Sequence, residues 1–336
     1  METRKIMSLG SSMAVTLPKY WLNSNNLSKG ESVTMTVQRD KTLLVRSAKD
    51  PNLLDKRELH ILVGFEEDED SIVRQVIAGF LNGYSTIKLT SNRYFTLEQN
   101  AVIRKITSRL YMMIVEADVG RITINTLLDE SKASVVSSVE RMHIITYSMC
   151  KDILGSFVSL DRDLIRAIST LEDDVDQLMF LVLRLIRLAA INPSLADKLG
   201  LDSFDCLDFQ TLVHRIARIA FHIAQMGESL IAIMDKEIPM PENVLSIIQE
   251  AAEIAFNTYD KAVRAFLMKD LTHTNEIINT QNRINELYSK ITPIPYFGKY
   301  NDLSSLSQIV TIREGVKKIS HYSADIAELA INRTYN

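Results

Sequence analysis

Residues 167–178, AISTLEDDVDQL, align with a second run further along the chain, EIINTQNRINEL (276–287). Another pair, RIAFHIAQMGE (218–228) and KISHYSADIAE (318–328), aligns in the same way. All four runs lie in long segments with the apolar spacing of an amphipathic helix. Because the pairs keep their order along the chain, they indicate that one helical unit is duplicated.

The helical pattern begins at about residue 131 and continues to the end of the chain. Proline-containing breaks at residues 192–193, 239–241 and 293–298 are typical helix ends. Six helices with short connections favour a mainly helical fold that contains two tandem, antiparallel three-helix bundles. The predicted helices are 131–158, 160–192, 207–236, 241–268, 272–291 and 303–333.

Residues 57–128 alternate between strand and helix patterns, which predicts a small α+β connector. No glycine-rich phosphate loop follows any of its strands, so a nucleotide site is not expected. The predicted strands are 59–65, 86–90, 112–116 and 121–126, and the predicted helices are 71–82 and 97–110.

Residues 1–50 have a different pattern, with short β segments and turns. VTMTVQRDKTLLVRS (33–47) has strand character on both sides of a polar turn and predicts a hairpin. Two further short strands are expected around residues 10–12, and Pro18 opens a short helical turn. A segment this small cannot bury a core of its own, so it must pair with a second copy or dock on the rest of the chain.

The charge distribution also separates this segment from the rest. Residues 1–50 carry eight Lys and Arg against four Asp and Glu, so the acidic excess of the whole chain lies in the remainder. A basic end on an acidic body favours a polyanionic partner for that end. The alternative is an ordinary solvated surface.

The overall composition supports folded domains. Hydrophobic residues make up 46% and charged residues 24%, which excludes a predominantly disordered chain. With only 11 glycines and 7 prolines, a β-sandwich or barrel is not expected. We expect four regions: 1–50, a swapped-hairpin domain; 51–130, the connector; and 131–238 and 239–336, the two helical bundles.

Cysteines and apolar runs point to a cytoplasmic protein. Cys150 and Cys206 are far apart in apolar segments, as expected for reduced structural thiols. The N-terminal run METRKIMSLGSSMAV contains no apolar stretch of signal-peptide length. The most apolar stretch, 178–191, is interrupted by Arg184 and Arg187. It is also shorter than the roughly 20 apolar residues that a bilayer span needs, so no membrane span is predicted.

One group of carboxylates has the spacing of candidate metal ligands. Glu172 and Asp176, with Asp173 beside them, share one face of a predicted helix. They would chelate a cation if a second helix supplied further ligands, and otherwise they form a solvated acidic turn. The matching positions of the second repeat are Gln281 and Asn285, two weak ligands, so at most one such site is expected.

The histidines form no catalytic set. All six are scattered singly, without an HExxH motif or a neighbouring nucleophile. A di-metal enzyme built in a helical bundle needs Glu-x-x-His pairs on facing helices, and these are missing. The sequence therefore predicts a protein that is not an enzyme.

The N-terminal run GSSMAVTLPKYWLNSNNLSKGESVTMTV (10–37) resembles the SpoVT/AbrB-type swapped-hairpin domain. The shared pattern is a Gly-Ser turn, an apolar-x-Leu-Pro-Lys stretch and a Leu-x-x-Gly-(Asp/Glu)-x-Val step. The resemblance implies that two chains interleave into one small barrel and that basic residues on its face bind DNA. The residues expected to contact DNA are Arg4, Lys5, Ser11, Ser12, Lys19, Arg39 and Lys41.

The C-terminal part resembles PhoU. The helix motif (Glu/Asp)-x-x-x-Asp of that family matches Glu172–Asp176, which implies a divalent or transition metal at the first repeat. The acidic ligand of a second motif, Glu-Arg-Ile-Gly-Asp-His-Ala, falls on Phe221 in repeat one and on His321 in repeat two. These departures count against the family's metal cluster.

The middle segment resembles archaeal proteins that fuse these two domains, through VIAGFLNGYSTIKL (76–89), LLDESKASVVSSVERMHIITYSM (127–149), and Arg104 with Arg109. The whole resemblance implies a phosphate-uptake regulator. One reading is a homodimer that binds promoter DNA and uses the helical body as a sensor. The alternative is an adaptor whose bundles dock on the ATPase subunit of a phosphate transporter and whose N-terminal domain only dimerises.

Overall fold

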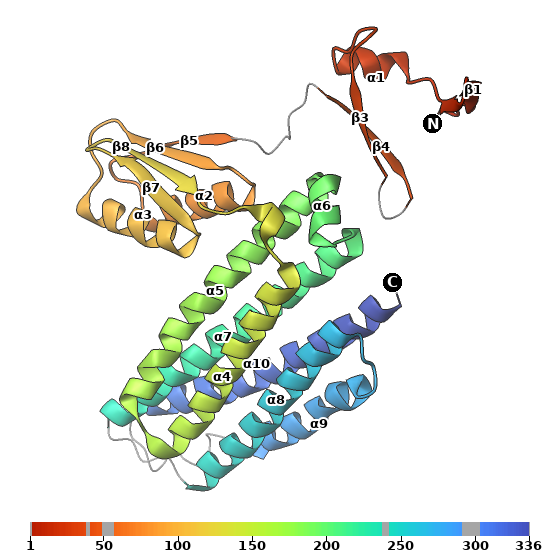
Figure 1. Ribbon diagram of the computed structural model, residues 1–336. Helices are drawn as coiled ribbons and strands as arrows, with labels where there is room; N and C mark the ends of the chain where they lie inside the picture. The colour runs from red at the N-terminus through yellow and green to blue at the C-terminus, as the bar shows by residue number, and fades with distance from the viewer. Residues whose placement is uncertain (1, 38–40, 49–56, 237–241, 291–302, 336) are drawn as a thin grey trace. The chain divides into compact units, whose positions relative to one another are not determined.

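The computed structural model describes residues 2–37, 41–48, 57–236, 242–290 and 303–335 (Figure 1). The chain divides into two compact units, Met1–Asp55 and Lys56–Asn336. The predicted boundaries after residues 50 and 238 lie outside the described residues. The connector belongs to the same compact unit as the helical bundles.

The N-terminal unit consists of two small hairpins and one short helix. Strands β1 (Met7–Leu9) and β2 (Ser12–Ala14) pair antiparallel, and α1 (Lys19–Ser24) follows Pro18. Strands β3 (Val33–Val37) and β4 (Leu43–Ser47) form a second antiparallel pair, as the sequence predicts. Gly10 has φ +61° in the tight turn between β1 and β2, a conformation that glycine adopts without strain.

The connector is a four-stranded sheet with two helices. Its strands are β5 (Glu58–Val63), β6 (Thr86–Ser91), β7 (Met112–Ala117) and β8 (Arg121–Thr126), in the spatial order β5-β6-β8-β7. Only β5 and β6 are parallel. Helices α2 (Glu69–Leu81) and α3 (Leu97–Arg109) pack against each other and contribute to one core with the strands.

The period of two along the strands produces this core. Ile87 and Leu89 on β6, and Ile61 and Val63 on β5, are buried, whereas the residues between them are exposed or half-buried. Phe80 of α2 is fully buried against these strands. A capping box closes the start of α3, in which Thr96 accepts a hydrogen bond from the backbone of Gln99. The connector therefore has a complete interior.

The helical body contains two three-helix bundles, as predicted. The first consists of α4 (Val135–Ser159), α5 (Arg162–Ile191) and α7 (Ser203–Asp235), and the second of α8 (Glu242–Met268), α9 (Thr274–Lys290) and α10 (Leu303–Thr334). α7 lies against α10 and α4 against α8 (Figure 1). One hydrophobic core runs through both bundles.

Two short elements were not predicted. A 3₁₀ turn, η1 (Glu130–Lys132), precedes α4, and α6 (Pro193–Leu199) follows the break at residues 192–193. α7 begins at Ser203 rather than at residue 207, because Asp202 and Asp205 form a capping box there.

Among the described residues, Ser203–Asp235 is the one helix long and apolar enough to cross a membrane by length and composition. The sequence predicts this helix at 207–236, but not as a candidate span, since residues 178–191 form the most apolar stretch. Since 56% of its apolar window is buried, its apolar character reflects packing inside the bundles.

Candidate functional site

The predicted DNA-contacting residues lie on the surface of the N-terminal unit. Arg4 is 2.6 Å from the carboxylate of Glu2, and Lys19 is the first residue of α1. Ser11 and Ser12 lie at the turn between β1 and β2, and Lys41 precedes β4. Arg39 lies outside the described residues. The described members, Arg4, Lys5, Ser11, Ser12, Lys19 and Lys41, are all exposed.

The same unit exposes its apolar side chains. Leu9 is 72% and Met13 77% exposed on the first hairpin, and Val37 is 70% exposed on the second. Ser47 is the one buried residue among those described up to position 48. Two isolated hairpins without an interior are marginally stable at best, so the apolar surface requires a second surface to cover it.

The acidic motif of the first repeat meets an arginine from the connector. Arg109, the last residue of α3, places Nη2 2.5 Å from Oδ1 of Asp173 and 3.2 Å from Oδ2 of Asp176. Both carboxylates lie on α5, far from Arg109 in sequence, so no local spacing could predict the contact. Sequence analysis found the carboxylates and missed their cationic partner.

The electrostatics of this motif follow from partial burial. Burial raises the pKa of Glu172, and the neighbouring charges of Asp176 and Asp173 raise it further. Burial also raises the pKa of Asp176, whereas the charge of Arg109 opposes this effect. A nearby cation stabilises the ionised form of neighbouring carboxylates, and the guanidinium of Arg109 is such a cation.

The residues at the family's other ligand positions do not fit a metal cluster. On α7, the acidic ligand position holds the half-exposed ring of Phe221, which packs edge-on against His222 with ring centres 5.4 Å apart. Gln281 and Asn285 stand at the matching positions of the second repeat. Within the parts of the chain that the structure describes, no three His, Cys, Asp or Glu side chains are grouped so as to hold a metal ion.

Basic and aromatic side chains line the contact of α7 with α10 instead. Arg215 is 3.0 Å from Asp325, and His222 stacks on Tyr322 with ring centres 5.9 Å apart. Burial, followed by the charges of Lys318 and Arg218, lowers the pKa of His222. Burial and the charges of Lys317 and Lys318 likewise lower the pKa of His321. The carboxylates of Asp325 and Glu314 oppose the lowering at His321.

Helix α5 also holds the connector through a buried arginine. Arg184 is 2% exposed and donates to the backbone carbonyls of Phe80 and Tyr84, at the end of α2. Its Nε lies 2.8 Å and its Nη2 2.7 Å from Oε1 of Glu130. Burial lowers the pKa of Arg184, and the charge of Glu130 opposes this effect. The sequence showed this charge in an apolar stretch, but not what it binds.

Two further side chains extend this contact along α5. Gln177 donates to the carbonyl of Ser108 in the last turn of α3 at 3.1 Å, and Arg187 donates to Oδ1 of Asn82 at 2.8 Å. Asn82 is the C-cap residue of α2. The C-terminal ends of both connector helices therefore meet donors on α5, as the unsatisfied carbonyls of helix ends require.

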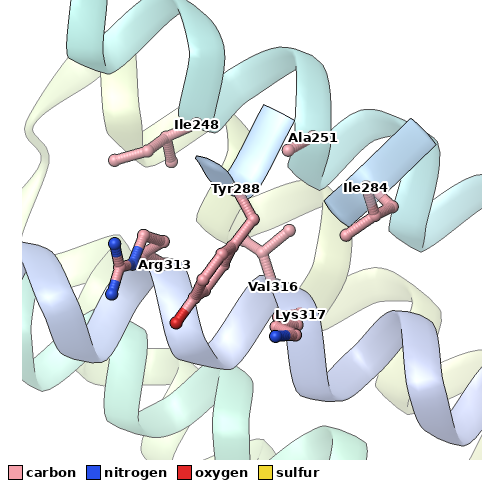
Figure 2. A pocket seen from close by; sticks show the side chains of 7 residues that line it. All are labelled: Ile248, Ala251, Ile284, Tyr288, Arg313, Val316 and Lys317. Atoms are coloured by element: carbon pink, nitrogen blue, oxygen red, sulfur yellow. The ribbon is translucent and has the colours of Figure 1, made fainter. Parts of the chain in front are cut away.

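Two of the hollows in this unit lie away from the acidic motif. One, between α8, α9 and α10, has a volume of about 10 Å³, enough for a single water. Figure 2 shows Arg313 and Lys317 on either side of the Tyr288 ring there, 4.1 and 4.2 Å from its centre. The other, of about 590 Å³, is open and lies where β5 and β6 end.

Comparisons with known proteins agree with this architecture. The sequence model of the PhoU domain matches residues 139–230 and 248–330, so each copy of the internal repeat falls in one of the two matched segments. The model for "Antidote-toxin recognition MazE, bacterial antitoxin" matches residues 6–52. A search of curated proteins found no match.

Two solved structures resemble the chain. The phosphate transport system regulatory protein PhoU from Streptococcus pneumoniae is 14% identical, with a TM-score of 0.50, over 59% of this chain and 91% of that one. PhoU from Pseudomonas aeruginosa is 16% identical, with a TM-score of 0.48, over 59% and 93%. At this identity the S. pneumoniae likeness concerns the fold. The PhoU matches cover just over half of the sequence and both repeats, so the chain belongs to the PhoU family.

Proposed function

We propose that this protein is a dimeric, DNA-binding transcriptional regulator of phosphate transport genes that acts in the cytoplasm. The observation that carries the proposal is the N-terminal unit, in which all described residues but Ser47 are at least partly exposed. A second copy of the same unit supplies the missing interior by interleaving its hairpins, which makes the protein a homodimer. The MazE match over residues 6–52 supports this assignment.

The charges of the same unit supply the affinity for DNA. Lys5, Lys19 and Lys41 are exposed and lie within a segment in which basic residues outnumber acidic ones two to one. In a dimer each of them occurs twice, so the basic surface doubles without any change in sequence. Contacts of lysine with phosphates provide most of the non-specific affinity for DNA, and they weaken with salt.

The PhoU body supplies the link to phosphate. The S. pneumoniae relative is named a phosphate transport system regulatory protein, and its fold is the one this body adopts. In our proposal the bundles act as the sensor and carry out no catalysis. The N-terminal unit then converts the state of the body into binding at promoters.

The proposal is tested by fluorescence anisotropy with the full chain and promoter fragments of phosphate transport genes. We compare wild type with a Lys5→Ala/Lys19→Ala variant and with a control variant, Lys105→Ala/Lys151→Ala. The control lysines are exposed, one on the connector and one on the helical body. Each lost phosphate contact should reduce the slope of log affinity against log salt by about 0.9. Loss in the first variant alone supports the proposal. Equal behaviour of all three contradicts it.

The second candidate is an adaptor that docks on the ATPase subunit of a phosphate transporter. The presence of both PhoU repeats favours it, because a complete body leaves an adaptor surface available. It predicts dimerisation without salt-sensitive DNA binding. Co-purification with the ATPase subunit, unchanged by Lys5→Ala/Lys19→Ala, would support it over transcriptional control.

A further inference from the structure

We propose that Arg109 is the built-in cation of the first PhoU repeat. The carboxylates where the family resemblance places a metal ion hold a guanidinium from the connector, and the motif serves as the docking site of α3 on α5. The inference concerns the body alone, so it stands or falls independently of DNA binding.

The geometry joins one guanidinium group to two carboxylates. Nη2 of Arg109 is 2.5 Å from Asp173 and 3.2 Å from Asp176, and the two carboxylates lie three positions apart on one face of α5. Arg109 is 28% and Asp176 31% exposed. Solvent therefore screens the charged hydrogen bond to Asp176 only in part. Asp173, which makes the shorter ion pair, is 56% exposed and is screened more strongly.

A metal ion and Arg109 need the same oxygens. A divalent cation binds carboxylate oxygens at about 2.0–2.6 Å, where the guanidinium lies now, and two cations at one pair of carboxylates repel each other. The remaining acidic ligand, Glu172, comes from the same helix. A cluster also needs ligands from a facing helix. On α7, the charge of Glu228 acts on Glu172 and raises its pKa, but among the described residues no three His, Cys, Asp or Glu side chains are grouped so as to hold a metal ion.

The facing helix α7 also carries charged residues that act on this motif. The cation of Arg218 acts on Asp176 and opposes the rise of its pKa. On the same helix, the carboxylate of Glu228 acts on Glu172 and raises its pKa. The two carboxylates that Arg109 contacts are therefore the part of the motif with basic neighbours.

The docking role has independent support along α5. Gln177, next to Asp176, donates to Ser108, the neighbour of Arg109, so two adjacent donor–acceptor pairs fix the last turn of α3. Arg184, two helical turns further on, fixes the end of α2. The acidic motif is thus the first part of one continuous contact face between α5 and the connector.

The test measures both docking and metal binding in the full chain. Hydrogen exchange of the last turn of α3 reports docking, and elemental analysis after dialysis against Mn²⁺ or Zn²⁺ reports metal. Wild type should retain far less than one ion per chain. Arg109→Gln should speed exchange at residues 104–110 by about tenfold, the size expected for one part-buried charged hydrogen bond.

A charge exchange and a matched control separate the docking contact from general damage. Arg109→Asp combined with Asp176→Arg should restore slow exchange that each single substitution loses. Arg162→Gln breaks another arginine–aspartate pair of α5, with Asp235, and should leave exchange in α3 unchanged. One or more ions per wild-type chain, lost in Glu172→Gln/Asp176→Asn, would overturn the inference. So would unchanged exchange in Arg109→Gln.

Discussion

The N-terminal unit and the connector are both small regions of short strands and helices, and they differ in where their apolar side chains go. In the connector, alternate residues of β5 and β6 enter a core closed by Phe80. In the N-terminal unit, the apolar residues of both hairpins are exposed or half-buried, and none of them is buried. The difference teaches that the connector has its own interior within the chain, whereas the described residues of the N-terminal unit do not, and in our proposal a second chain supplies it.

A charge on the uncovered apolar surface tests the comparison most directly. Leu9→Asp would place a carboxylate in the interior that two copies share, where an unpaired charge is strongly unfavourable. We expect the dimer dissociation constant to rise by at least about 100-fold, the equivalent of about 2.7 kcal/mol. Light scattering across a dilution series measures it.

The connector offers a matched control for this change. Leu97, the first residue of α3, is 84% exposed, more than Leu9. Leu97→Asp adds the same charge at a helix N-terminus, where a carboxylate is tolerated. It should leave dimerisation unchanged, and an equal loss in both variants would break the comparison between the two regions.

A large-to-small substitution in the core of the connector should lower the free energy of unfolding strongly. Phe80→Ala should lower the free energy of unfolding of the unit Lys56–Asn336 by about 3–5 kcal/mol, because it leaves a cavity. Val119→Ala, at a 74% exposed position in the same region, should change it by less than about 0.5 kcal/mol. Denaturant titrations at two protein concentrations provide the measurement, and a small effect of Phe80→Ala would refute a closed core.

Replacing the buried arginine that joins the connector to α5 should lower the free energy of unfolding nearly as much as Phe80→Ala. Arg184→Met keeps the bulk of the side chain but leaves Glu130 and two backbone carbonyls without their donor. We expect a loss of about 3 kcal/mol, against less than about 1 kcal/mol for Arg187→Met at the exposed end of the contact. Thermal unfolding compares them, and equal effects would argue against a buried anchor.

The smallest expected effect is a dependence of body stability on pH that the N-terminal unit does not share. Burial lowers the pKa of His143, whose Nε2 lies 2.9 Å from Asp260, so the folded state holds it neutral more firmly than the unfolded state, whose pKa is near 6.5. Its contribution is complete above that value and is lost as pH falls through it toward the lowered pKa.

His143→Gln should therefore flatten the decline in body stability between about pH 7 and 5. Dimer dissociation should stay constant over the same range, because the unit Met1–Asp55 contains no histidine. The comparison uses urea titrations at several pH values for wild type and variant. A variant as pH-sensitive as wild type would show that His143 is not the group responsible.

The sequence predicted the elements well because their patterns are local. Strands of period two and helices of period 3.6 located nearly every element of the connector and the bundles. α6 was missed because it is too short to show a period, and the start of α7 was placed late because the cap at Asp202 was overlooked. These are signals a closer reading of helix caps would find.

The sequence showed the acidic residues of the site but not the basic residue that contacts them. Glu172 and Asp176 stand out because they are four positions apart on one helix, but Arg109 reaches them from a different region of the chain. Arg184 looked like an interruption of an apolar run, and its acceptors are backbone carbonyls in a distant part of the sequence. Contacts of this kind depend on the packing of the connector against α5, which no local pattern encodes.

The most direct test of the central idea combines the two regions in one anisotropy titration on promoter DNA with the full chain. Wild type and Leu97→Asp should bind alike, with a steep dependence on salt, and Leu9→Asp should lose binding together with its dimer. Tight binding by a monomeric Leu9→Asp variant, or no binding by wild type at low salt, would contradict the account of a DNA-binding unit completed by a second chain.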